Sequence, residues 1–190
     1  LAHEMKTPLA NLRIWMEAGP QGRPAMERAI VDMDRVIERC VHAGQLSDHN
    51  LKPRHEWLDA AELTQNVLAA SRQPSRVQLS MPTDVCAVHT DAQMLSIVLS
   101  NLLENAYKYS IGGTPISLSL TPYADTRGAP GWRWVVDNTV GEAGMPDARK
   151  VFDKYYRGAN ARRQSGSGLG LFLVKSLLEL MQGTVTCLPM

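Results

Sequence analysis

The chain has 190 residues, of which 44% are hydrophobic and 21% charged. This balance is typical of one ordinary globular domain or two small ones, and it excludes wholesale disorder. The formal net charge of +1 gives no reason to expect nucleic-acid or membrane-surface binding. Three widely spaced cysteines (Cys40, Cys86 and Cys187) indicate thiols in a reducing compartment rather than a disulfide framework or a zinc site.

Two helices are predicted at residues 1–18 and 25–50, joined by a turn rich in glycine and proline. Each helix carries one narrow apolar seam, and in the second the seam alternates three- and four-residue steps. Two such helices cannot enclose a core alone, so we expect two chains to form a homodimeric four-helix bundle through residues 1–50.

Residues 51–56 have the composition of a linker, and residues 57–190 predict a second domain of alternating helices and strands. Its predicted helices lie at 59–72, 91–109 and 168–182, and its predicted strands at 76–80, 85–89, 115–121, 131–137 and 184–188. We therefore predict an α+β chain overall, in which the hairpin precedes an α/β sandwich with helices on one face of the sheet.

His3 points away from the seam of its helix, next to Glu4 and on the same face as Thr7. Pro8 removes the backbone hydrogen bond to Glu4 and should bend the helix there. A neutral, exposed imidazole beside a carboxylate has the properties of a nucleophile with its base. Taken alone, the pair is more typical of a solvated surface histidine near a proline kink.

The polar residues Asn101, Asn105 and Lys108 recur at i, i+4 and i+7, and therefore stack along one side of a predicted helix. A column of amide oxygens that ends in an ammonium group suits a hydrated Mg²⁺ bridging phosphates. The alternative is an ordinary polar edge of a buried helix face.

Further along, Asp137 ends an apolar strand, where its carboxylate could accept a hydrogen bond from an adenine amino group. Two later segments suit phosphate. One holds the cations Lys154 and Arg157, and the other is Gly166-Ser167-Gly168-Leu169-Gly170 at the start of the last helix, where backbone amides and the helix dipole favour an anion. Solvated cations and a plain glycine-rich turn are the alternatives.

The string His3-Glu4-Met5-Lys6-Thr7-Pro8-Leu9 resembles the H box of two-component sensor histidine kinases. The strings around Asn105, Asp137, Phe152 and Gly168 resemble, in the same order, the N box, first glycine box, F box and second glycine box of that family. One departure is clear. Thr139 replaces the first glycine after Asp137, and Gly141 and Gly144 compete for the second glycine position.

The resemblance implies a Bergerat-type ATP-binding fold with a mixed sheet, and ATP and Mg²⁺ as cofactors. It implies His3 as phosphoacceptor, Glu4 as general base, Thr7 as the residue that orients water for phosphatase activity, and Asn105 as the Mg²⁺ ligand. It also implies a set of nucleotide contacts: Asn101, Asn105, Lys108, Tyr109, Asp137, Gly141, Gly144, Lys154, Arg157, Gly166, Gly168, Leu169 and Gly170.

The implied partner is a response-regulator receiver domain, and the expected location is the cytoplasmic portion of a bacterial inner-membrane sensor. We expect both ends to be truncated, with membrane attachment only through segments absent here. Two alternatives stay open. A degenerate kinase would act as a dimeric docking or phosphatase module, and an ATPase related to gyrase or heat-shock chaperones would use the same nucleotide fold. Asn101, where such ATPases carry a glutamate base, argues against the second.

Overall fold

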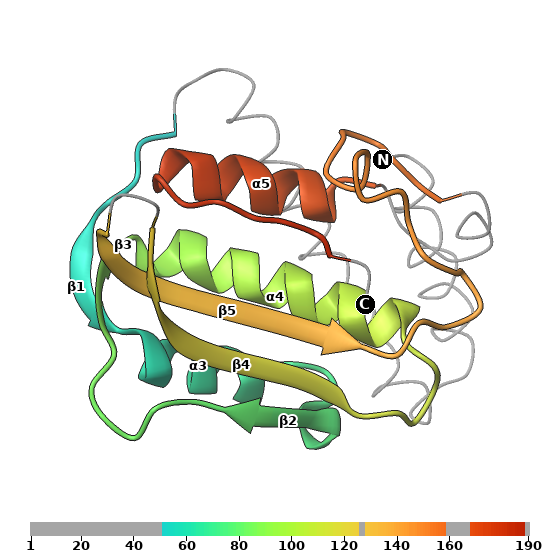
Figure 1. Cartoon of the computed structure of the whole chain (residues 1–190), viewed down its shortest axis with the longest axis horizontal. Helices are drawn as coiled ribbons and strands as arrows, with labels where there is room; N and C mark the ends of the chain where they lie inside the picture. The colour runs from blue at the N-terminus through green and yellow to red at the C-terminus, as the bar shows by residue number, and fades with distance from the viewer. Residues whose placement is uncertain (1–50, 126–127, 159–167, 189–190) are drawn as a thin grey trace, which may run out of the picture.

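The computed structural model describes residues 51–125, 128–158 and 168–188 (Figure 1). The predicted hairpin of residues 1–50 lies outside this range. In chain order the described elements are β1 (Glu56–Asp59), α3 (Ala60–Ala69), the short 3-10 helix η2 (Pro74–Arg76), β2 (Val77–Ser80), β3 (Ala87–Thr90), α4 (Ala92–Tyr109), β4 (Ile116–Ala124), β5 (Pro130–Asn138) and α5 (Gly170–Leu180).

The strands form two sheets. The larger has the order β2-β4-β5, with β2 parallel and β5 antiparallel to β4, so the predicted mixed sheet is confirmed. The smaller is the antiparallel pair β1–β3. In Figure 1, α3 and α4 lie behind β4 and β5, with α5 beside α4.

Only one face of the larger sheet is covered by helices in the described residues. Ile116, Leu118 and Leu120 of β4 are buried, and the indole Nε1 of Trp134 on the same face donates to Thr64 Oγ1 of α3 at 2.9 Å. The opposite face exposes polar and charged side chains, among them Ser117, Thr121, Arg133 and Asp137. The predicted single helical layer is therefore observed.

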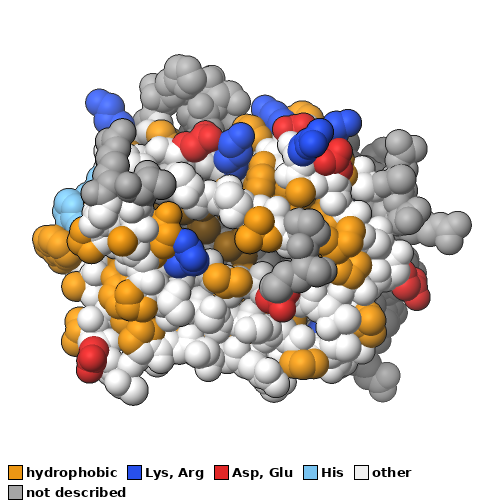
Figure 2. Space-filling view, in the orientation of Figure 1, with side chains coloured by type: hydrophobic (Ala, Val, Ile, Leu, Met, Phe, Trp, Pro, Cys, Tyr) orange, Lys and Arg blue, Asp and Glu red, His pale blue; other side chains and the backbone are white. Residues whose placement is uncertain are grey.

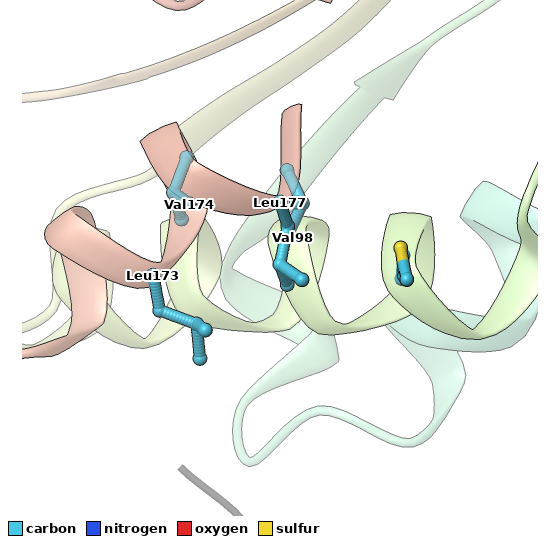
Figure 3. Packing of buried hydrophobic residues seen from close by; sticks show 5 residues of the cluster. Val98, Leu173, Val174 and Leu177 are labelled. Carbon is cyan, nitrogen blue, oxygen red and sulfur yellow. The ribbon is translucent and has the colours of Figure 1, made fainter. Parts of the chain in front are cut away.

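The position of α5 is set by its packing on α4. Five buried side chains form the contact: Met94, Val98, Leu173, Val174 and Leu177 (Figure 3). They recur at helical spacing on each helix, so the two apolar stripes face each other. This packing fixes the N-terminus of α5 against the middle of α4. Figure 2 shows hydrophobic side chains around a shallow hollow in the surface between α5 and β5.

Helix α4 begins at a double contact. Asp91 caps the helix by accepting a hydrogen bond from the Met94 backbone N–H at 2.9 Å, and its other oxygen accepts from the Arg54 backbone N–H at 2.7 Å. One carboxylate thus joins the segment that enters the domain to the first turn of α4.

The sequence-based prediction was wrong at two places. Residues 184–188 form no strand, because they pair with no described strand, although their side chains alternate between half-buried and exposed. In addition, Glu56 is not linker but the first residue of β1, because its backbone pairs with Thr90 of β3. No helix in the described ranges combines the length and the apolar character that a membrane crossing needs.

Candidate functional site

Two asparagine side chains lie one turn apart on α4, and the helix backbone holds both. Asn101 is only 7% exposed, and its Nδ2 donates to the Ile97 carbonyl at 2.8 Å. The Nδ2 of the half-buried Asn105 donates in the same way to the Asn101 carbonyl at 2.9 Å. Each amide nitrogen is therefore committed to the helix, which fixes the side chain and keeps its oxygen as the acceptor for another group.

The first residue of α5 lies directly against these two amides. A Cβ atom built on Gly170 would be 3.1 Å from Asn101 Oδ1 and 3.7 Å from Asn105 Nδ2. A glycine at this place lets the backbone of α5 approach the asparagines without a side chain between them. The structure thus brings Asn101, Asn105 and Gly170 together, three residues that the sequence assigns to one site.

The N-terminus of α5 has the features of an anion site. Its cap residue, Leu169, makes no side-chain hydrogen bond to the first turn. Gly168 precedes it with a φ of +72°, a backbone conformation that glycine adopts easily. The N–H groups of the first turn of a helix and the helix dipole favour a negative group such as phosphate. Because Asn101 and Asn105 lie beside this turn, a phosphate bound there would also meet their amides.

The predicted phosphate cations lie in the segment before α5. The Tyr155 backbone N–H donates to the Gly168 carbonyl at 3.0 Å, so this segment is tied to the start of α5. The Lys154 ammonium lies 5.5 Å from the ring centroid of Phe172, in the first turn of α5. Arg157 is half-buried. Lys154 therefore lies near the α5 N-terminus, as a phosphate contact requires.

A second group of predicted residues surrounds the end of α4. Lys108 and Tyr109 are half-buried, and the Lys108 ammonium lies 4.8 Å from the Tyr109 ring centroid. The Gly141 backbone N–H donates to the Tyr109 carbonyl at 2.8 Å, and a Cβ atom on Gly141 would clash with that same oxygen. Gly144 has a φ of +71° and closes a turn with Gly141. The loop after β5 thus packs closely on α4.

Asp137 is placed differently from the other predicted residues. It is exposed, and its cross-strand partner is the exposed Ser117, so it lies on the sheet face that points away from the helices. The next residue, Asn138, is half-buried and pairs with the fully buried Ile116 on the helix-facing side. The structure does not bring Asp137 to the side of the sheet where Asn101, Asn105 and Gly170 lie.

The remaining predicted residues, His3, Glu4, Thr7 and Gly166, lie outside the described residues. Two residues near the site were missed by the sequence reasoning, Phe172 and Asn138. The helical position of Phe172, two residues after Gly170, could have placed it in the first turn of α5. The alternation of Trp132, Trp134 and Val136 could have placed Asn138 on the inner face of β5.

The described residues suit a magnesium ion only when phosphates share it. Within them, no group of three or more His, Cys, Asp or Glu side chains could hold a metal ion. Mg²⁺ prefers oxygen ligands and is usually held by few protein groups together with substrate phosphates and water. The amide oxygen of Asn105, next to the α5 N-terminus, fits that donor set.

Residues 90–189 match the family model described as "Histidine kinase-, DNA gyrase B-, and HSP90-like ATPase". The chain belongs to this family. The matched region holds α4, β4, β5 and α5, which are the elements that carry the asparagines and the α5 N-terminus. Membership of this ATPase family supports ATP as the nucleotide that the domain binds.

Several curated proteins are similar in sequence to nearly the whole chain, beyond the residues that the family model matches. The sensor protein KdpD of Escherichia coli K12 is 26% identical over 98% of this chain and 22% of its own length. The sensor histidine kinase CusS of Escherichia coli O6:H1 is 30% identical over 97% of the chain and 41% of its own length. The sensor histidine kinase YxdK of Bacillus subtilis is 28% identical over 96% of the chain and 57% of its own length. The chain therefore spans less than two thirds of these relatives.

Solved structures support the fold. The Acinetobacter baumannii histidine kinase AdeS matches with a TM-score of 0.66 and 18% identity, over 96% of this chain and 88% of that one. Full-length ShkA, solved in complex with AMPPNP, matches with a TM-score of 0.63 and 23% identity, over 98% of this chain and 41% of that one. The ATP-binding fold expected from the sequence motifs is thereby confirmed for this domain.

Proposed function

We propose that this chain is the catalytic core of a two-component sensor histidine kinase, which moves the γ-phosphoryl group of Mg-ATP to His3 and then to a response-regulator aspartate. One observation supports this most strongly: the bare backbone of Gly170 at the α5 N-terminus lies against the amides of Asn101 and Asn105. Curated relatives that match almost the full chain are named sensor histidine kinases.

In the proposed site the triphosphate lies over the α5 N-terminus. Asn105 would hold Mg²⁺, which would neutralise phosphate charge, and Asn101 would contact the same phosphates. Lys108, Lys154 and Arg157 supply positive charge, and Tyr109 packs near the nucleotide. Catalysis then consists mainly of positioning and charge stabilisation.

The phosphoryl transfer itself uses His3. One imidazole nitrogen attacks the γ-phosphorus in line, the bond from that phosphorus to the β–γ bridging oxygen breaks, and ADP leaves. Glu4 accepts the proton from the other ring nitrogen. A receiver-domain aspartate later takes the phosphoryl group. Thr7 orients the water that hydrolyses the phosphorylated regulator in the reverse, phosphatase role.

The choice between kinase and ATPase depends on Asn101. An ATPase of this fold needs a base to activate water, and an amide is not a base at neutral pH. The Asn101 amide is also fixed by its hydrogen bond to the Ile97 carbonyl. The nucleotide is therefore preserved for His3. We further propose that residues 1–50 form the homodimer and that residues 51–55 lead from it into the domain.

The test is incubation with γ-labelled ATP and Mg²⁺, followed by acid and base treatment of the protein. We expect label that is lost in acid and stable in base, and we expect His3→Gln to abolish it without changing ATP affinity. The matched control is His55→Gln, because His55 is an exposed histidine of the described domain. Label that persists in the His3 variant would contradict the proposal.

One observation favours a second candidate, a degenerate kinase that docks or dephosphorylates regulators without efficient autophosphorylation. Thr139 occupies a position where the family motif has glycine. Its carbonyl accepts a hydrogen bond from the Ile111 backbone N–H at 3.2 Å. A loop held this closely to α4 could limit the space for a base. A calorimetric titration with Mg-ATP separates the two candidates, because absence of binding heat would favour the degenerate form.

A further inference from the structure

Two neighbouring polar residues at the end of β5 lie on opposite faces of the sheet. Cross-strand partners share a face, so the pairs Asn138–Ile116 and Asp137–Ser117 define the two sides. Ile116 is fully buried, whereas Ser117 and Asp137 are both exposed. Asn138 therefore lies on the helix-facing side, and Asp137 lies on the solvent side.

The helix-facing side is the side of the candidate nucleotide site. On this side of the sheet, the Trp134 side chain is hydrogen-bonded to Thr64 of α3. Helix α4, which carries Asn101 and Asn105, lies on the same side. A nucleotide whose phosphates contact Asn105 and the α5 N-terminus keeps its base within the same helical layer. The carboxylate of Asp137 would have to cross the plane of the sheet to reach that base.

The end of β5 also lies next to the end of α4. The Ile111 backbone N–H donates to the Thr139 carbonyl, and Ser110 and Val140 form an isolated antiparallel bridge. Asn138 is thus one residue from a point where β5 and α4 are joined by hydrogen bonds. Its side chain makes one long hydrogen bond, from Nδ2 to the Thr139 carbonyl at 3.3 Å, which a ligand could displace at small cost.

We infer that Asn138, and not Asp137, is the residue that contacts the base and sets nucleotide specificity. This inference rests on the proposed function, since it needs an ATP site. An amide has both an acceptor oxygen and a donor nitrogen, so Asn138 can accept from the adenine amino group and donate to the adjacent ring nitrogen. When the same amide is rotated by a half-turn, its nitrogen can donate to the guanine carbonyl oxygen and its oxygen can accept from the guanine ring N–H. Asn138 can therefore pair with either base, and we expect only weak discrimination between ATP and GTP.

The experiment measures ATP and GTP affinity by calorimetry in the presence of Mg²⁺. Asn138→Ala should weaken ATP binding about 5-fold, as expected for the loss of neutral hydrogen bonds. Asn138→Asp should weaken both ATP and GTP binding, because a carboxylate has no donor and would repel both the adenine ring nitrogen and the guanine carbonyl oxygen. Asp137→Asn and Asp137→Ala should leave both affinities within about 2-fold.

The reverse pattern, in which the Asp137 variants lose ATP affinity and Asn138→Ala does not, would overturn the inference and leave the proposed kinase function intact. If the unmodified chain binds neither ATP nor GTP, both the proposed kinase function and the inference about Asn138 fail. Thermal unfolding of each variant checks its fold. Because Asp137 is exposed and Asn138→Asp keeps the side-chain size, these two positions provide variants whose folding is little affected.

Discussion

A Cβ atom on Gly170 would lie 3.1 Å from the Oδ1 atom of Asn101. This separation is tighter than most Cβ contacts, and the asparagine cannot easily move away because its Nδ2 is hydrogen-bonded to the Ile97 carbonyl. A methyl group at residue 170 would therefore push the Asn101 amide out of place by a few tenths of an ångström, against its hydrogen bond to Ile97. The consequence is testable in both ligand binding and stability.

We predict that Gly170→Ala weakens ATP binding about 10-fold while the free energy of unfolding changes by less than about 1 kcal/mol. The methyl group displaces the amides of Asn101 and Asn105, but alanine favours the helix more than glycine does, which offsets the stability cost. Calorimetric titration and thermal unfolding provide the two measurements. Gly112→Ala is the control, because no atom lies within 4 Å of its Cβ position. An unchanged ATP affinity in Gly170→Ala would contradict the prediction.

The second prediction concerns magnesium. In the unmodified chain, ATP affinity should fall when EDTA removes Mg²⁺, because in the proposed site the ion would be held by Asn105 together with the phosphates. Asn105→Ala should bind ATP with nearly the same affinity with or without Mg²⁺, and should lose about 1 kcal/mol of stability with its hydrogen bond to the Asn101 carbonyl. Retention of the full magnesium effect in this variant would assign the ion to another ligand.

The third prediction tests the contact between the sheet and α3. The Trp134 indole donates to Thr64 Oγ1 at 2.9 Å, and Thr64 in turn donates to the Ala60 carbonyl at 2.6 Å. Thr64→Val keeps the side-chain shape but leaves the indole N–H without this acceptor, so we expect a loss of about 1–2 kcal/mol in urea unfolding.

A double-mutant cycle isolates that bond. When Trp134→Phe is combined with Thr64→Val, the donor and acceptor are both absent, so the double variant should be less destabilised than the sum of the single variants. Additive effects would show that the hydrogen bond contributes no coupling energy.

The fourth prediction is a pH dependence. Burial raises the pKa of Tyr107 above its usual value of 10.0, and the hydrogen bond to Ser71 opposes this only in part. Because the folded-state pKa is the higher one, the contribution of this tyrosine to stability is complete below the unfolded-state value. It is lost as the pH rises through the folded-state value.

The comparison is between the unmodified chain and Tyr107→Phe. At neutral pH the variant should be about 1 kcal/mol less stable, because it lacks the 2.8 Å hydrogen bond to Ser71. Above about pH 10 this difference should shrink, since the ionised tyrosine is disfavoured in its partly buried place. A stability difference that stays constant through alkaline pH would contradict the assignment. The other tyrosines are common to both proteins and cancel.

The sequence predicted α3 and α4 well because their apolar residues recur at helical spacing and their N-terminal caps are aspartates. Asp59 and Asp91 cap α3 and α4, and both helices begin one residue after the cap. The stacking of Asn101 and Asn105 follows from helix geometry alone. Their closeness to Gly170 does not, because it depends on packing between α4 and α5, and only the order of the motifs indicated it.

The sequence was less informative where burial on the two sides of a strand is similar. In β5, the two tryptophans and Val136 alternate with Arg133, which favours the helix-facing side for Asn138, but the apolar Val135 on the other face weakens this contrast. Pairing with β4 decides it. For Thr184, Thr186 and their neighbours, β-branched residues and alternation predicted a strand, but a strand also needs a partner with which to share backbone hydrogen bonds.

The double contact at Asp91 bears on how a signal could reach the nucleotide. The carboxylate is buried and binds the backbone of Arg54 as well as that of Met94, and Leu51 packs on the α4–α5 cluster. Residues 51–54 are therefore anchored to α4 and to the α4–α5 cluster. A displacement of this short segment would be transmitted directly to the helix that carries Asn101 and Asn105.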